Sequence, residues 1–213
     1  DPSDDELVEF LEKSNIKFFR GSLHDVLNRF VALLDEYPAD FLVRVTGDCP
    51  FINPKFIDFQ LRMVAKFNAD IISLDQECSI LEGQGVHSSS SLRIADAKST
   101  HPDDREHVGS KYFLENRLNF KTIGIQIPQK FKKISIRLAV DEQKDFDLAE
   151  LLYEKLWDKN SIIPFDKLTR FLLNNPNIIG INDDVKNSQI NKDVLQLKQN
   201  LTDHVDNWIN WAG

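Results

Sequence analysis

The sequence of 213 residues has little cysteine, no long apolar run and no excess of positive charge. Its two cysteines, Cys49 and Cys78, are too few for a disulfide framework and fit a reducing, cytoplasmic compartment. No apolar run approaches the length of a membrane span and no signal peptide is visible, so we expect no membrane partner. The formal net charge of −8 argues against a nucleic-acid-binding surface, but it leaves room for a local basic pocket that takes a small phosphate compound. The five histidines show no paired metal-ligand spacing, so a zinc site has little support.

Short apolar runs alternate with amphipathic segments along the chain, which predicts an α/β domain with a largely parallel sheet. Ser22 and Asp25 resemble a capping box at the start of one amphipathic segment. We expect strands at residues 16–19, 40–45, 70–74, 120–127 and 133–140. We expect helices at residues 1–15, 23–37, 54–67, 91–99, 102–118, 143–157 and 164–173, and a loop rich in Gly and Ser over residues 75–91.

The last thirty residues differ in composition from the rest of the chain. They are polar, with sparse apolar anchors that include Trp208 and Trp211. We therefore predict one domain over residues 1–182 and a helical tail over residues 183–213. Because two tryptophans are costly to leave in water, we expect this tail to pack on the domain or on a partner subunit, such as the second copy of a homodimer.

Two of the predicted strands end on a carboxylate. The run FLVRV leads through Gly47 to Asp48, and the run ISIRLAV leads to Asp141. Ligands of open α/β sheets bind beyond the carboxyl ends of the strands, and glycine lets the backbone come close to a ligand. Two carboxylates on one rim predict a Mg²⁺ site, because Mg²⁺ is commonly held by one or two carboxylates plus substrate phosphates. An Asp after a strand is also common as a turn former or a helix N-cap, so neither carboxylate alone decides the matter.

Four stretches resemble, in order, the cytidylyltransferase family that includes the spore-coat polysaccharide biosynthesis proteins. They read FFRGSLHDVLNRF, VRVTGDCPFINPKFID, DDREHV and IRLAVDEQKDFDL. The sugar-acid cytidylyltransferases, for neuraminate and ketodeoxyoctonate, are broader relatives. The resemblance implies a three-layer α/β/α, Rossmann-like nucleotide-diphospho-sugar transferase fold. It also implies an enzyme that uses Mg²⁺ to transfer CMP from CTP to a sugar acceptor for the biosynthesis of surface polysaccharide or glycan.

The resemblance assigns roles to two sets of residues. Asp48 and Asp141 match the family's metal-binding carboxylates, so they would be the catalytic pair. Arg20, Gly21 and Ser22 match a segment that lies near the nucleotide.

A third matching set, Arg105, Glu106 and His107, lies near the acceptor sugar in the family. Two further candidates come from their place in the chain. Arg44 lies inside an apolar run, where it either contacts the bound nucleotide or alternates out to solvent. Gln84 lies in the Gly- and Ser-rich stretch, which is either a loop that contacts the acceptor or a mobile surface loop.

One family feature has no counterpart in this sequence. Family members open with a strand and a phosphate-cradling loop of the type R-x-x-S-x-R-L-P-G-K, and no stretch of the 213 residues matches it. We therefore expect an N-terminally truncated version of the fold, with open strand edges and weakened substrate binding. Two alternatives follow: a glycosyltransferase of related fold that uses a nucleotide-sugar donor, or a non-catalytic relative that keeps the scaffold and has lost the phosphate loop.

Overall fold

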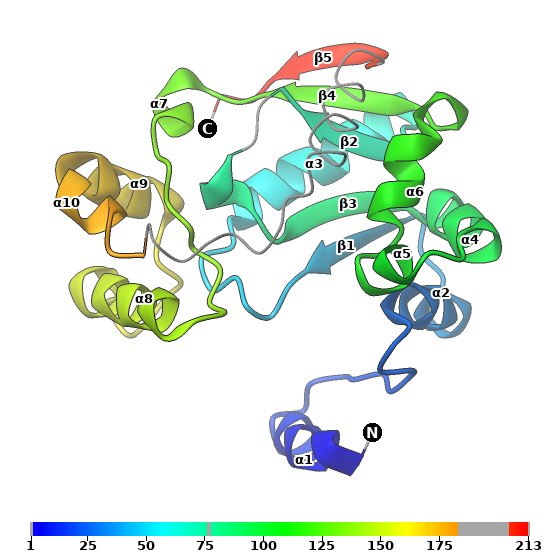
Figure 1. The fold of residues 1–213 in the computed structure, drawn as a ribbon, viewed down its shortest axis with the longest axis horizontal. Coiled ribbons are helices and arrows are strands. Elements are labelled where there is room, and N and C mark those ends of the chain that lie inside the picture. The colour runs from blue at the N-terminus through cyan, green and yellow to red at the C-terminus, as the bar shows by residue number, and fades with distance from the viewer. Residues whose placement is uncertain (1, 76–77, 183–204, 213) are drawn as a thin grey trace.

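The structure is a computed structural model that describes residues 2–75, 78–182 and 205–212. Its centre is a five-stranded sheet in the order β1-β3-β2-β4-β5 (Figure 1). β2, β4 and β5 run parallel, and β3 runs antiparallel to both β1 and β2. The strands are β1 (Phe41–Val45), β2 (Ile71–Leu74), β3 (Gln84–Ser88), β4 (Thr122–Gln126) and β5 (Asn207–Asn210). The predicted α/β, Rossmann-like class is confirmed, and most strands of the sheet point the same way.

Helices cover both faces of the sheet, as the three-layer prediction requires. The helices are α1 (Asp5–Lys13), α2 (Val26–Glu36), α3 (Pro54–Phe67), α4 (Ser89–Lys98), α5 (Pro102–Glu106), α6 (Ser110–Glu115), α7 (Gln129–Lys132), α8 (Gln143–Leu156), α9 (Phe165–Asn174) and α10 (Pro176–Ile179). Short 3-10 turns lie at Pro2–Asp4, Ser79–Leu81 and Arg117–Asn119. None of the helices in the described part of the chain is long and apolar enough to cross a membrane.

The apolar residues of each strand alternate between the two faces, which divides the core. Leu42 and Ile71 pack against α2, α4 and α6 on one face. Val86 and Ile123 pack against Val64 of α3 on the other face. A third cluster joins Ile125 to α8, α9 and the α3 residue Phe56, so helices distant in sequence share one core.

Local capping explains where several helices begin. The Asn53 side chain accepts hydrogen bonds from the N–H groups of Lys55 and Phe56, and Pro54 opens α3, as predicted. The prediction for Ser22 is wrong, because Asp25 is the residue that caps α2 and accepts from the Asn28 N–H at 2.9 Å.

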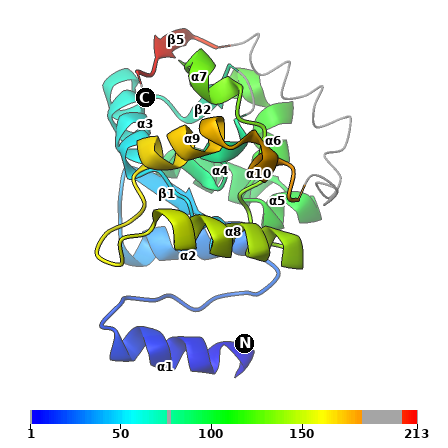
Figure 2. The ribbon, with the colours of Figure 1, turned by 90° about the vertical axis from the view of Figure 1, so that its left-hand side faces the viewer.

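Several predicted elements differ from the observed ones. Residues 16–19 form no strand, and α1 lies apart from the rest of the fold with no buried residue (Figures 1 and 2). The stretch predicted as a loop contains β3, which pairs with β1. Its Gly and Ser content did not indicate a strand. Residues 133–140 form no strand, although their apolar side chains alternate into the core. The helix expected over 102–118 breaks at Val108 and Gly109, which both have positive φ.

The C-terminal segment joins the sheet instead of forming the expected helix. Asn207–Asn210 is β5, which pairs in parallel with β4, and residues 183–204 lie outside the described residues. Trp211 is buried against Phe56 and Phe131 in the domain's own core. The Trp208 ring covers Gly124 so closely that an added Cβ there would lie 2.4 Å from it. Packing of the two tryptophans therefore draws this segment back onto the sheet.

β1 forms one edge of the sheet. Its inner side pairs with β3, and no strand pairs with its outer side in the part of the chain that the structure describes.

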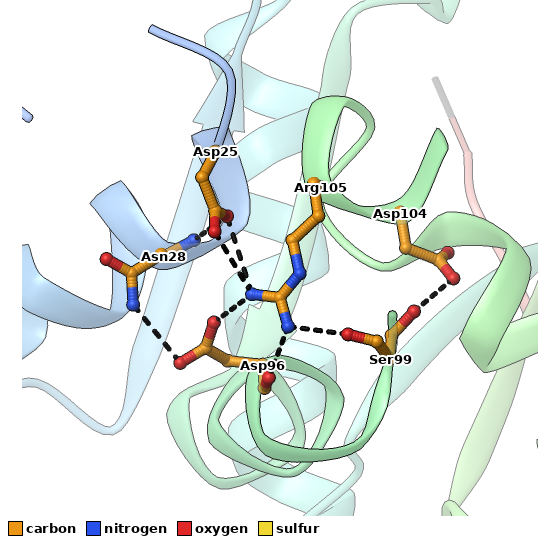
Figure 3. Close-up of polar contacts among 6 residues, drawn as sticks. All are labelled: Asp25, Asn28, Asp96, Ser99, Asp104 and Arg105. Carbon is orange, nitrogen blue, oxygen red and sulfur yellow. Dashed lines mark hydrogen bonds and ion pairs between the residues drawn. The ribbon is translucent and has the colours of Figure 1, made fainter. Parts of the chain in front are cut away.

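A half-buried polar cluster around Arg105 ties three helices together (Figure 3). The guanidinium donates to the Asp96 side chain at 2.5 Å, to the Ser99 carbonyl at 2.5 Å, and to Asp25 at 3.4 Å. Burial lowers the pKa of Arg105, and the hydrogen bonds and charges of Asp96 and Asp25 outweigh this effect and raise it. Arg105 therefore holds the start of α2 against the end of α4 from its position on α5.

We expect Arg105→Ala to lower the free energy of unfolding by about 2 kcal/mol, because it leaves two carboxylates without their shared donor. Urea unfolding measures the change. Arg93→Ala is the matched control, because it removes an exposed ion pair to Asp35 from α4 and should cost less than about 1 kcal/mol. Equal losses in the two variants would contradict the role of the cluster.

His87 is a partly buried residue of β3. Its ring stacks on Phe113 with the ring centroids 5.5 Å apart, and its Nδ1 is buried without a hydrogen-bond partner in the described residues. Burial, followed by the positive charge of Arg44, lowers the pKa of His87 from 6.5 to about 4.

The native state therefore binds fewer protons than the unfolded chain between these two pKa values, and stability must fall as the pH falls through this window. The free energy of unfolding of the unaltered protein should decrease between pH 7 and pH 4.5, and we expect His87→Gln to make this decrease smaller by roughly 2 kcal/mol. Urea unfolding at the two pH values measures this difference. The exposed His24 provides the control, since His24→Gln should leave the acid sensitivity unchanged. An unaltered acid profile in His87→Gln would refute the assignment.

Candidate functional site

An open cleft of about 790 Å³ lies beyond the carboxyl end of β1. Its walls come from four segments: α2, the end of β1 with the turn after it, the end of α5, and residues 137–142. The cleft is strongly charged. Its basic side chains are Arg29, Arg44, His107 and Arg137, and its acidic ones are Asp48, Glu106, Asp141 and Glu142.

The two predicted metal-binding carboxylates both line this cleft. The Val140 N–H donates to the carbonyl of Asp48 at 2.8 Å, so the chain before Asp141 runs beside the turn after β1. A hydrogen bond from the Cys49 N–H to the Thr46 carbonyl closes that turn. The structure thus brings Asp48 and Asp141 from distant parts of the sequence to one cleft, while their joint hold on a metal remains a prediction.

Each of these carboxylates has an arginine beside it. Burial lowers the pKa of Arg44, and the negative charge of Asp48 opposes that shift. The Arg137 guanidinium forms an ion pair with Asp141, whose side chain is 52% exposed. Arg44 lines the cleft, and its contact with a bound nucleotide stays a prediction.

A buried network supports the wall that carries Asp141. Asp145, on the first turn of α8, has a fully buried side chain that accepts from Arg137 Nε at 3.1 Å and from Asn182 Nδ2 at 2.7 Å. The N–H groups of Asp141 and Glu142 also donate to it. Sequence reasoning missed Asp145 and Asn182; the third position of the α8 capping box could have revealed Asp145, and no sequence feature pointed to Asn182.

Of the four predicted acceptor-binding residues, Glu106 and His107 line the cleft and Gln84 and Arg105 do not. The Gln84 side chain accepts from the Asn53 N–H at 3.2 Å and so supports the start of α3. The Arg105 guanidinium is held within the polar cluster of Figure 3. The geometry gives both side chains structural roles, so sugar contact is a prediction without support for Gln84 and Arg105.

The segment predicted to lie near the nucleotide is also outside the lining of the cleft. Arg20 forms an ion pair with Asp5 of α1 at 2.8 Å. Gly21 lies against Arg29, a side chain that does line the cleft, and Ser22 is exposed. Nucleotide contact by Arg20, Gly21 and Ser22 stays a prediction, and Arg29 is a cleft residue that the sequence analysis did not single out.

The donor set of the cleft fits a hard divalent cation. Asp48 is exposed and Asp141 half-exposed, and both offer carboxylate oxygens. Among the residues that the structure describes, no three His, Cys, Asp or Glu side chains gather as a metal-binding group. Two carboxylates without further protein ligands match the way Mg²⁺ is held, since it keeps waters and substrate phosphates as its other ligands.

Comparison with known proteins gives one family match and similar proteins from two organisms. Residues 2–178 match the cytidylyltransferase family. An uncharacterized protein of Methanocaldococcus jannaschii is 34% identical over 185 residues, which are 86% of this chain and 74% of that protein. The spore coat polysaccharide biosynthesis protein SpsF of Bacillus subtilis is 26% identical over 78% of this chain and 71% of its own length.

A solved structure agrees with the sequence relatives. The cytidylyltransferase from Leptospira borgpetersenii superposes with a TM-score of 0.72 at 25% identity, covering 88% of this chain and 76% of that one. The family match spans the turn after β1, the residues that line the cleft and Asp145, and it ends before Asn182. The chain belongs to the cytidylyltransferase family.

Proposed function

We propose that this protein transfers CMP from CTP to a sugar acceptor, for the biosynthesis of a surface polysaccharide or glycan. The observation that carries the proposal is that Asp48 and Asp141 line the same cleft in a chain of the cytidylyltransferase family. Support for the pathway comes from the likeness to the spore coat polysaccharide biosynthesis protein. The two cysteines, both free and buried, fit a cytoplasmic site for this reaction.

In this reaction an acceptor oxygen of the sugar attacks the α-phosphorus of CTP, and pyrophosphate leaves. Such transfer depends on positioning the two reactants and on neutralising phosphate charge. Asp48 and Asp141 would hold Mg²⁺, whose charge stabilises the negative charge that develops on the phosphates. Glu106 and His107, which line the α5 side of the cleft, would orient the acceptor, and Arg44, which also lines the cleft, would attract the anionic nucleotide.

We expect Asp48→Ala to reduce pyrophosphate release by at least about 100-fold, because it removes one of the two carboxylates that would hold the metal. The assay supplies CTP, Mg²⁺ and a panel of sugars, and a coupled enzyme reports pyrophosphate. Circular dichroism should show an unchanged fold, since Asp48 is exposed. Asp147→Ala, which removes an exposed carboxylate of α8, is the control and should keep full turnover. Undiminished CMP-sugar formation by Asp48→Ala would defeat the proposal.

Two further measurements separate the proposal from its alternatives. Turnover with a nucleotide-sugar donor and none with CTP would identify a glycosyltransferase instead. Calorimetry with CTP and Mg²⁺ is the companion assay, and the absence of any heat would favour a non-catalytic scaffold.

A further inference from the structure

Arg137 connects the cleft to the interior of the protein. Its Nε donates to Asp145 Oδ2 at 3.1 Å, and its Nη2 contacts Asp141 Oδ2. The side chain is only 14% exposed, yet it contributes to the wall of the cleft. One guanidinium thus bridges a buried carboxylate and one that faces the substrate.

The interior end of this bridge is fixed. The Asp145 side chain is fully buried and accepts from Asn182 Nδ2 at 2.7 Å and from the N–H groups of Asp141 and Glu142, both at 3.1 Å. Asn182 also donates to the Arg137 carbonyl at 3.0 Å. Burial raises the pKa of Asp145, and these hydrogen bonds together with the charge of Arg137 outweigh it and lower the pKa, so the carboxylate stays ionised.

The cleft end of the bridge is exchangeable. Asp141 is 52% exposed, and an ion pair at such a site contributes little to stability. The guanidinium presents five donors in a planar fork, so it can keep its Nε bond to Asp145 while its terminal nitrogens change partner. A phosphate in the cleft would offer those nitrogens the acceptor geometry that arginine prefers.

We propose that Arg137 binds a phosphate group of the nucleotide, and that Asp141 occupies this position until the nucleotide arrives. The inference rests on the proposed function, in which Asp141 would help Asp48 to hold Mg²⁺ once the nucleotide is bound. Asp145 then balances the charge of Arg137 in both states. Asp145 and Asn182 are positioning residues, because they hold the guanidinium at the cleft wall.

The sharpest test measures anion binding without any metal. Isothermal titration calorimetry with pyrophosphate, in the presence of EDTA, should show that Asp141→Asn binds about tenfold more tightly than the unaltered protein, because the substitution removes the carboxylate charge that competes with the anion for Arg137. Adding Arg137→Lys to Asp141→Asn should remove most of this gain, since lysine cannot reach Asp145 and a phosphate with one planar fork.

Glu142→Gln is the matched control. Glu142 also lines the cleft and carries the same charge, and glutamine keeps the acceptor that caps α8. If the effect belongs to Arg137, this variant should gain less than about threefold from the general loss of negative charge. A gain equal to that of Asp141→Asn, no gain in Asp141→Asn, or a gain that survives Arg137→Lys would each overturn the inference.

Two more comparisons show which part of the nucleotide is recognised and whether this inference or the proposed function fails. The gain in affinity on Asp141→Asn should be the same for CTP as for pyrophosphate. Cytidine binds weakly and is followed by saturation-transfer NMR, and its affinity should not change. A gain in affinity for cytidine would contradict phosphate recognition. If the unaltered protein releases pyrophosphate in the transfer assay and the metal-free gain is missing, this inference alone fails. If the gain is present and no sugar is converted, the phosphate site stands and CMP transfer fails.

Discussion

The hydrogen bond from the Val140 N–H to the Asp48 carbonyl, 2.8 Å long, is the contact on which the cleft depends. It fastens the chain before Asp141 beside the turn that ends β1, so two acidic side chains that are far apart in sequence face the same space. Alternate apolar side chains of residues 133–140 anchor this segment, because Ile134, Ile136 and Leu138 are buried in the core. The Asp141 side of the site is therefore built by packing of an irregular segment, and the Asp48 side is built by the end of β1 and the turn after it.

The charges of the cleft are arranged in pairs, and this arrangement has a physical reason. Two carboxylates that face one cleft repel each other. Arg44 beside Asp48 and Arg137 beside Asp141 offset that repulsion before any ligand binds. The same arginines then supply positive charge to an incoming nucleotide, so one set of residues serves the empty and the loaded site.

The sequence was sufficient for the class of fold and for the turn that carries Asp48, because buried strands and the turns that end them leave local patterns. Asp141 lines the same cleft although residues 133–140, predicted as the strand before it, form no strand. Asn53 with Pro54 marked the start of α3, and Gly47 with Asp48 marked the end of β1. β3 was missed because a strand rich in Gly and Ser depends on pairing partners that no local pattern shows. β5 was read as a helix because its parallel pairing with β4 joins residues that lie more than eighty positions apart in sequence. Arg105 was assigned to substrate by resemblance, whereas its partners on α2 and α4 became visible only in three dimensions.

The most direct test of the shared metal site is a crystal structure of the protein with CTP and Mn²⁺, which takes the place of Mg²⁺ and gives an anomalous signal. We expect one anomalous peak at a coordination distance of about 2.1 Å from a carboxylate oxygen of Asp48 and from one of Asp141. A metal held by only one of these side chains, or bound elsewhere while CTP occupies the cleft, would contradict the account.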